Sequence, residues 1–195
     1  MVGKYTDLSD AYLGIKEAFI HAGAHQDTKV HIHWIDADKV DEAPDAADVL
    51  GSLDGILVPG GFGPRGAEGK IKAITDARTH GMPFLGICYG FQLATVENAR
   101  NVLGLAGTNS TEVDPHTTHP VIDLLPGHTH DEDKGATMRL GASEVRIKRD
   151  TKAADFYQQD VVFERHRHRW KSTLATSTSS KAAASSMAVA TPRAN

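Results

Sequence analysis

The chain has 195 residues and very little cysteine: Cys88 is the single one. One cysteine excludes an internal disulfide and any site built from several thiolates. No apolar run approaches the roughly 18–20 residues that a membrane span needs. The first residues also lack the apolar segment of a secretory signal. We therefore expect a cytoplasmic protein without a membrane partner.

Neither sign of charge dominates, since 21 basic and 25 acidic side chains give a net charge of -4. A nucleic-acid or polybasic membrane surface needs a basic excess. Arg165, Arg167 and Arg169 alternate with histidines, but three arginines in an acidic chain do not make a nucleic-acid site. We therefore expect no nucleic-acid partner.

Residues 171–195 differ in composition from the rest of the chain. Ser, Thr and Ala fill 17 of these 25 positions, and no aromatic or acidic residue occurs there. Such a segment buries too little apolar area to offset its ordering entropy. We predict a folded domain over residues 1–170 and a low-complexity, disordered tail over 171–195. A short helix around 181–189 would be marginal on its own.

The domain alternates helical and strand-like patterns. Helical spacing of apolar residues appears over 11–22, 67–77 and 91–103, while Gly23 and Gly104 are placed to end helices. Strand patterns appear in short runs, and residues 105–135 read mainly as loop. This order predicts an α/β fold whose central, mostly parallel sheet is flanked by helices. The predicted strands are 30–34, 55–58, 84–87, 137–148 and 160–170.

Cys88 lies where a predicted strand ends and a helix begins, which is where reactive groups gather in α/β sheets. Gly86 and Gly90 stand two residues to either side, the spacing of a nucleophile elbow. The small neighbours permit the sharp turn, and a helix N-terminus favours a thiolate. The residues alone leave two interpretations open, a nucleophile or a buried structural cysteine.

A glycine-rich segment, Pro59 to Gly63, follows the preceding predicted strand. Glycines allow close backbone approach, so free N–H groups here can face Cys88 and form an oxyanion hole. The plainer interpretation is an ordinary turn. The combination of this loop with the elbow on adjacent strands is more informative than either feature alone.

These residues, with further stretches along 4–170, resemble the class I (triad-type) glutamine amidotransferases and, within them, the CTP synthase family. The resemblance implies the flavodoxin-like sheet of that family. The matching stretches are Pro59–Lys70 without Pro64 and Ala67, Gly86–Leu93, Asp10–Tyr12, Ala99–Leu103, Asn109–Glu112, His119–Asp123, Thr137–Gly141 and Glu164–Arg169.

The resemblance implies a role for each matching site residue. Cys88 would attack the side-chain amide of L-glutamine and release ammonia through a thioester. The loop residues Gly60, Gly61 and Phe62 would hold the oxyanion and substrate. The residues implied to bind glutamine are Gly61, Tyr89, Gln92, Glu112 at the α-ammonium and Arg169 at the α-carboxylate.

The chain departs from the family pattern at both ends. We expect the synthase domain, with its ATP and Mg²⁺, to be absent from this chain, together with the homo-oligomer contacts it carries. The similarity stops at Trp170, before the family's F-H-P-E segment with the catalytic His and Glu. We therefore expect little glutamine hydrolysis, because the thiol lacks its base. The histidines that would have to replace this missing base are His116, His119, His128, His130, His166 and His168.

The sequence leaves other functions open. One alternative is an inactive glutamine-binding or interaction module with the same fold. A weaker one is another single-cysteine hydrolase, such as a PfpI-like protease or a γ-glutamyl hydrolase. The segment His128–Asp133 contains metal-ligand residue types but reads as a solvated acidic loop, and His31 and His33 read as surface residues. We expect no metal and no cofactor in this domain.

Overall fold

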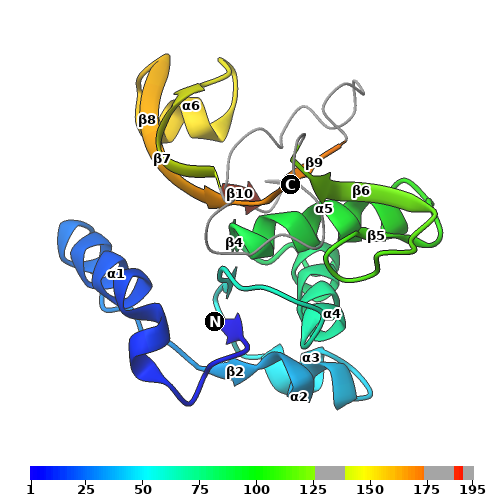
Figure 1. The fold of residues 1–195 in the computed structure, drawn as a ribbon. Helices are drawn as coiled ribbons and strands as arrows, with labels where there is room; N and C mark the ends of the chain where they lie inside the picture. Colours follow the sequence, from blue (N-terminus) through cyan, green and yellow to red (C-terminus); the bar gives the residue numbers. More distant parts are fainter. Residues whose placement is uncertain (126–138, 174–186, 191–195) are drawn as a thin grey trace.

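The computed structural model describes residues 1–125, 139–173 and 187–190. Its helices alternate with short strands along the first half of the chain (Figure 1). The helices are a 3-10 turn at Ser9–Tyr12, then α1 (Leu13–His25), α2 (Ala37–Glu42), α3 (Ala47–Leu50), α4 (Ala67–Thr79), α5 (Tyr89–Asn101) and α6 (Lys152–Tyr157).

The strands of the described residues form four small sheets. Parallel pairs join β1 to β2, β3 to β4 and β5 to β6. Antiparallel pairs join β4 to β10, β6 to β9 and β7 to β8. The strands are β1 (Val2–Gly3), β2 (Ile35–Asp36), β3 (Ile56–Val58), β4 (Phe84–Ile87), β5 (Thr108–Ser110), β6 (His119–Leu124), β7 (Arg139–Arg146), β8 (Val161–His168), β9 (Trp170–Ser172) and β10 (Met187–Ala190).

Two consecutive strand–helix units, β3–α4 and β4–α5, form the centre of the molecule (Figure 1). All three residues of β3 are buried. Continuous apolar runs of this kind are typical of parallel strands covered on both faces. Apolar side chains of α4 and α5, such as Ile74 and Leu93, join the main core cluster with Val58. The predicted α/β class, with its parallel strand pairs, is thereby confirmed.

The hairpin β7–β8 has a different character. It carries α6 in its connection and projects from the upper left of the molecule in Figure 1. Along β8 the side chains alternate between exposed and half-buried, so none is fully buried. Phe163 on this strand is 72% exposed. The hairpin therefore has one partly covered face and contributes little to the core.

The strand predicted over 30–34 is wrong, because the only strand in this region is β2, at Ile35–Asp36. Ile32 and Trp34 instead join a second apolar cluster, in which the rings of Tyr12 and Trp34 stack at 6.0 Å. The alternating pattern thus reflects packing against the N-terminal turn. Helix α1 also continues to His25, two residues beyond Gly23.

Residues 105–125 contain more regular structure than predicted, since β5 and β6 pair there. The segment expected to be a tail also differs from expectation in its described parts. Lys171 and Ser172 belong to β9, Thr173 hydrogen-bonds Val121 and Pro120, and Met187–Ala190 pairs with β4 as β10. No helix of the described residues is long and apolar enough to cross a membrane.

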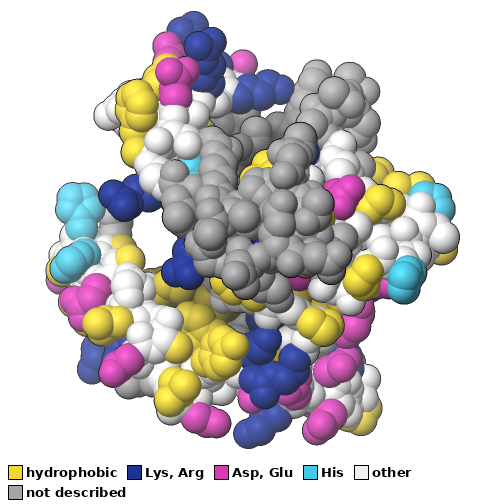
Figure 2. Space-filling model, viewed as in Figure 1, with side chains coloured by type: hydrophobic (Ala, Val, Ile, Leu, Met, Phe, Trp, Pro, Cys, Tyr) yellow, Lys and Arg dark blue, Asp and Glu magenta, His cyan; other side chains and the backbone are white. Residues whose placement is uncertain are grey.

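Charged side chains of both signs are spread over the face of the molecule seen in Figure 2. Acidic and basic groups occur together along its lower part, and apolar side chains lie above them. The sequence count of 21 basic and 25 acidic side chains agrees with this mixture. Among the described residues on this face, no extended field of one sign is present.

Candidate active site

Cys88 occupies a sharp turn between β4 and α5, as the elbow spacing predicts. Its backbone has φ +53° and ψ -105°, a strained combination for a residue with a side chain. A Cβ on Gly90 would lie 2.1 Å from the Val58 oxygen, and one on Gly86 would lie 2.9 Å from the Gly90 backbone. Both glycines are therefore required, because backbone packs directly on backbone here.

The glycine-rich loop after β3 lies against Cys88. A Cβ placed on Gly60 would be 3.6 Å from the Cys88 Cβ and 3.9 Å from its Sγ. One placed on Gly61 would contact the Tyr89 ring at 3.6 Å. Phe62 is exposed. The structure thus places Gly60 beside Cys88 and Gly61 beside Tyr89, at the ends of adjacent strands.

The electrostatic surroundings of Cys88 differ from the expectation of an activated thiolate. Burial raises the pKa of the Cys88 thiol above its ordinary value, and the nearby Glu112 carboxylate raises it further. The Tyr89 backbone amide acts in the opposite direction and does not outweigh burial. In this state the thiol is protonated near neutral pH, so attack on a substrate requires removal of that proton.

Glu112 follows β5 and reaches the glycine-rich loop. Its Oε1 accepts a hydrogen bond of 2.9 Å from the Gly63 amide, and its own amide donates to Ser110 Oγ at 3.2 Å. The Tyr89 hydroxyl donates to the Gly63 carbonyl at 2.7 Å. Glu112 and Tyr89 are therefore both linked to the loop, and Glu112 is near enough to Cys88 to influence its pKa.

Gln92 on α5 and Arg169 between β8 and β9 both contact Trp170. The Gln92 Nε2 donates to the Trp170 carbonyl at 3.4 Å, and the Arg169 guanidinium lies 5.6 Å from the centre of the Trp170 ring. Both side chains are buried, Arg169 with only 1% of its surface exposed. A buried guanidinium suits the recognition of a carboxylate.

Lys70, which ends a matching stretch but was given no site role, also lies near the site. It is fully buried, its Nζ lies 5.0 Å from the centre of the Tyr89 ring, and no hydrogen-bond partner is present among the described residues. Burial, aided by Lys4 and Arg65, lowers its pKa to about 8. The helical spacing of Ala67, Ile71 and Ile74 places position 70 on the apolar face of α4, which was the available signal.

The histidines considered as substitute bases have other surroundings where the structure describes them. His119 Nδ1 lies 2.9 Å from Thr118 Oγ1, and the Nδ1 atoms of His166 and His168 lie 3.1 Å apart on β8. His128 and His130 lie outside the described residues. Within residues 1–125, 139–173 and 187–190, no three His, Cys, Asp or Glu side chains are grouped to hold a metal ion.

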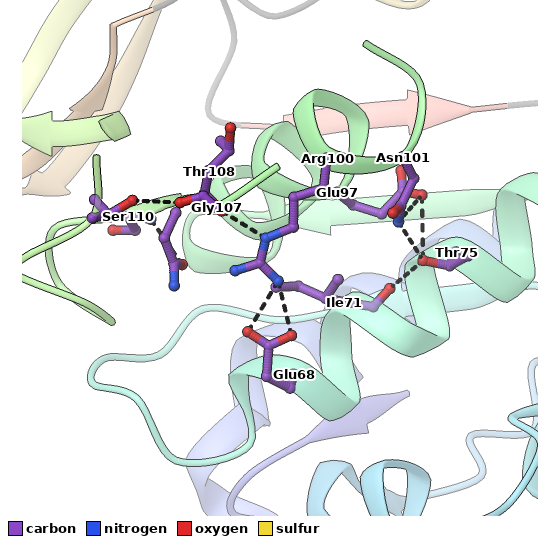
Figure 3. Close-up of polar contacts among 11 residues, drawn as sticks. Glu68, Ile71, Thr75, Glu97, Arg100, Asn101, Gly107, Thr108 and Ser110 are labelled. Atoms are coloured by element: carbon purple, nitrogen blue, oxygen red, sulfur yellow. Dashed lines mark hydrogen bonds and ion pairs between the residues drawn. The ribbon is translucent and has the colours of Figure 1, made fainter. Parts of the chain in front are cut away.

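A polar network links α4, α5 and β5 (Figure 3). Arg100 on α5 donates to the Thr108 carbonyl at 2.6 Å and pairs with Glu68 on α4 at 2.9 Å. The nearly buried Glu97 accepts from Arg78 and Asn101. These contacts connect the helix after the glycine-rich loop with the strand before Glu112, so the two sides of the site are held at a fixed separation.

A strained cysteine turn, an adjacent glycine-rich loop and parallel strand–helix units together define an α/β protein with an elbow-type cysteine at its strand ends. The family description "Glutamine amidotransferase class-I" matches residues 7–191, and the chain belongs to this family. The match extends into the segment where a separate tail was expected.

Similar proteins narrow the comparison further. A "CTP synthase" of Pyrococcus abyssi is 54% identical over 171 residues, and one of Archaeoglobus fulgidus is 56% identical; each match covers 88% of this chain. The chain spans about a third of the length of these relatives, 32%. A solved structure, "Trypanosoma brucei CTPS - glutaminase domain with bound acivicin", matches with TM-score 0.80 and 36% identity, covering 89% of this chain and 67% of the other.

Proposed function

We propose that this chain is the glutamine-hydrolysing part of a CTP synthase. The observation that carries the proposal is the strained Cys88 turn beside Gly60 and Gly61 in a member of the amidotransferase family whose relatives are CTP synthases. The ammonia released would serve the ATP-dependent amination of UTP to CTP, performed by a synthase domain. That domain, with its ATP, Mg²⁺ and oligomer contacts, is a proposed partner, and the cytoplasmic location stays a prediction.

The reaction follows from the proposed roles. The Cys88 sulfur forms a bond to the amide carbon of glutamine, and the carbonyl oxygen becomes an oxyanion held by backbone N–H groups of Gly60 and Gly61. The C–N bond then breaks, and ammonia leaves with the proton taken from the thiol. Water hydrolyses the γ-glutamyl thioester to glutamate and restores the thiol.

Substrate recognition is assigned to charged and amide side chains around the elbow. Glu112 would accept the α-ammonium of glutamine, and Arg169 would hold its α-carboxylate in a bidentate pair. Gln92 and Tyr89 complete the proposed pocket. The burial of Arg169 supports this role, because a desolvated guanidinium gains most from a carboxylate partner.

The raised pKa of Cys88 favours a second candidate, a module that binds glutamine without turning it over. Calorimetry with the Cys88→Ser protein measures binding, and glutamate release by the unmodified chain measures turnover. Glutamine binding that asparagine does not reproduce supports the proposed pocket; no binding at millimolar glutamine overturns it. With binding present, slow glutamate release fits the sequence prediction, while no release at any pH supports the binding module.

A further inference from the structure

One peptide unit of the glycine-rich loop is held at both of its polar atoms. The Phe62 carbonyl accepts a hydrogen bond of 2.7 Å from the Lys4 ammonium, and the Gly63 amide of the same unit donates to Glu112 at 2.9 Å. The described chain has no cis peptide bond, so the C=O and N–H of this unit point to opposite sides. A cation and an anion therefore hold the unit from two sides.

The next peptide unit is fixed as well. The Gly63 carbonyl accepts from the Tyr89 hydroxyl at 2.7 Å, and Gly63 itself has φ +77°, a conformation that favours glycine. The Arg65 guanidinium donates to the Lys4 carbonyl at 2.8 Å and so ties the far end of the loop to β1. Two consecutive units are thus anchored by side chains from separate elements.

The charges select one orientation of the Phe62–Gly63 unit. Hydrogen bonds to ionised groups are stronger than neutral ones, and an ion at each end of an amide polarises it in the same direction. If the unit turned over, its carbonyl oxygen would face the Glu112 carboxylate and its N–H would face the Lys4 ammonium. Both contacts would become repulsive, so the upstream part of the loop at Gly60 keeps its position beside Cys88.

We propose that Lys4 is a positioning residue for the oxyanion loop, acting through the Phe62 carbonyl. The inference rests on the proposed glutaminase function. The Lys4 contact matters for substrate binding, because the Glu112 carboxylate is also assigned to the α-ammonium of glutamine. When substrate engages Glu112, the Gly63 amide shares its acceptor, and the Lys4 contact keeps the peptide from turning at that moment.

The test compares three proteins with the unmodified chain. Lys4→Met removes the ammonium and keeps the aliphatic length, Lys4→Arg keeps a cationic donor, and Lys39→Met makes the same charge change at an exposed position on α2. Hydrogen–deuterium exchange over residues 60–66 reports the loop directly. Inactivation of Cys88 by acivicin, analysed as maximal rate and half-saturating concentration, reports the site, and iodoacetamide alkylation reports plain thiol access.

With Lys4→Met we expect the Gly63 amide to exchange about tenfold faster and the maximal rate of inactivation to fall about tenfold, the effect of losing one charged hydrogen bond. The half-saturating acivicin concentration and the iodoacetamide rate stay within twofold. Lys4→Arg recovers at least a third of the rate, and Lys39→Met resembles the unmodified chain.

Unchanged exchange in Lys4→Met overturns the inference, as does an equal loss in Lys4→Arg and Lys4→Met. These results are distinct from failure of the proposed function. If the unmodified chain resists acivicin, the glutaminase assignment fails, and the exchange measurement still decides whether Lys4 holds the loop.

Discussion

The elbow region, residues 56–101, and the hairpin β7–β8 differ in how tightly they are packed. In the elbow region, backbone contacts backbone at glycines, β3 is wholly buried and β4 alternates buried with half-buried residues. In the hairpin, side chains alternate between exposed and half-buried along β8, and Gly141 has open space around it. The Cys88 sulfur therefore lies in the more tightly packed of the two regions.

The two regions meet at the end of β8, where Arg169 and Trp170 enter the core and Gln92 contacts the Trp170 carbonyl. Half of the proposed glutamine pocket therefore depends on how the hairpin is anchored. Single substitutions in each region separate the contributions of the two regions to stability and to chemistry.

Gly90→Ala should have the largest effect. Its new methyl group would lie 2.1 Å from the Val58 oxygen, so β3 and α5 must separate, and we expect a loss of about 4 kcal/mol in the free energy of unfolding. Gly141→Ala in the hairpin meets no atom within 4 Å and carries only the strain of φ +94°, which costs about 1 kcal/mol. Urea unfolding compares them, and equal losses would contradict the proposed difference between the regions.

Lys70→Met should stabilise the elbow region at pH 7 by roughly 2–3 kcal/mol, because it removes a buried charge without a partner among the described residues. The folded pKa of about 8 lies below the unfolded value, so the unfolded state binds more protons between about pH 8 and 10.5. Stability of the unmodified chain therefore rises with pH in that window.

The advantage of Lys70→Met should shrink as the pH rises from 8 toward 10. Urea unfolding at pH 7, 8.5 and 10 follows it, with Lys39→Met as the control for an exposed lysine. A constant difference across this range would show that Lys70 does not titrate as its burial implies.

Glu112→Gln should make Cys88 more reactive toward iodoacetamide. The carboxylate raises the pKa of the thiol, while glutamine keeps an acceptor oxygen for the Gly63 amide. We expect alkylation at pH 8 to become about threefold faster, because a lower thiol pKa shifts the pH profile of the reaction to lower pH. An unchanged pH profile would mean that Glu112 does not act on the thiol.

Phe163→Ser in the hairpin should have the smallest effect. The ring is 72% exposed, so its replacement should change the free energy of unfolding by less than about 0.5 kcal/mol. Differential scanning calorimetry should find the melting temperature nearly unchanged. A large loss would reveal that the hairpin is packed against another surface in solution.

The strand–helix units could be predicted because their signals are local. Continuous apolar strands such as Ile56–Val58 and glycines at fixed distances from Cys88 record burial and close backbone contact directly in the sequence. The predicted strand over 30–34 failed because Ile32 and Trp34 join the apolar cluster around Tyr12 without pairing to a neighbouring strand. Strand β5 was missed because Thr108, Asn109 and Ser110 are polar although buried.

The site was predictable in its parts and less so in its electrostatics. The elbow spacing located Cys88, but the sequence could not show that burial outweighs the helix N-terminus and raises the thiol pKa. Nor could it show that Lys4, 58 residues before Phe62, holds the loop. Such contacts depend on how separate elements meet in space, which no local pattern records.

Mass spectrometry of the unmodified chain after incubation with acivicin tests the central claim most directly. We expect a single adduct on Cys88. Added glutamine should slow its formation, and added asparagine should leave the rate unchanged. The absence of an adduct, or labelling of Cys88 that glutamine does not slow, would contradict the assignment of this elbow as a glutaminase site.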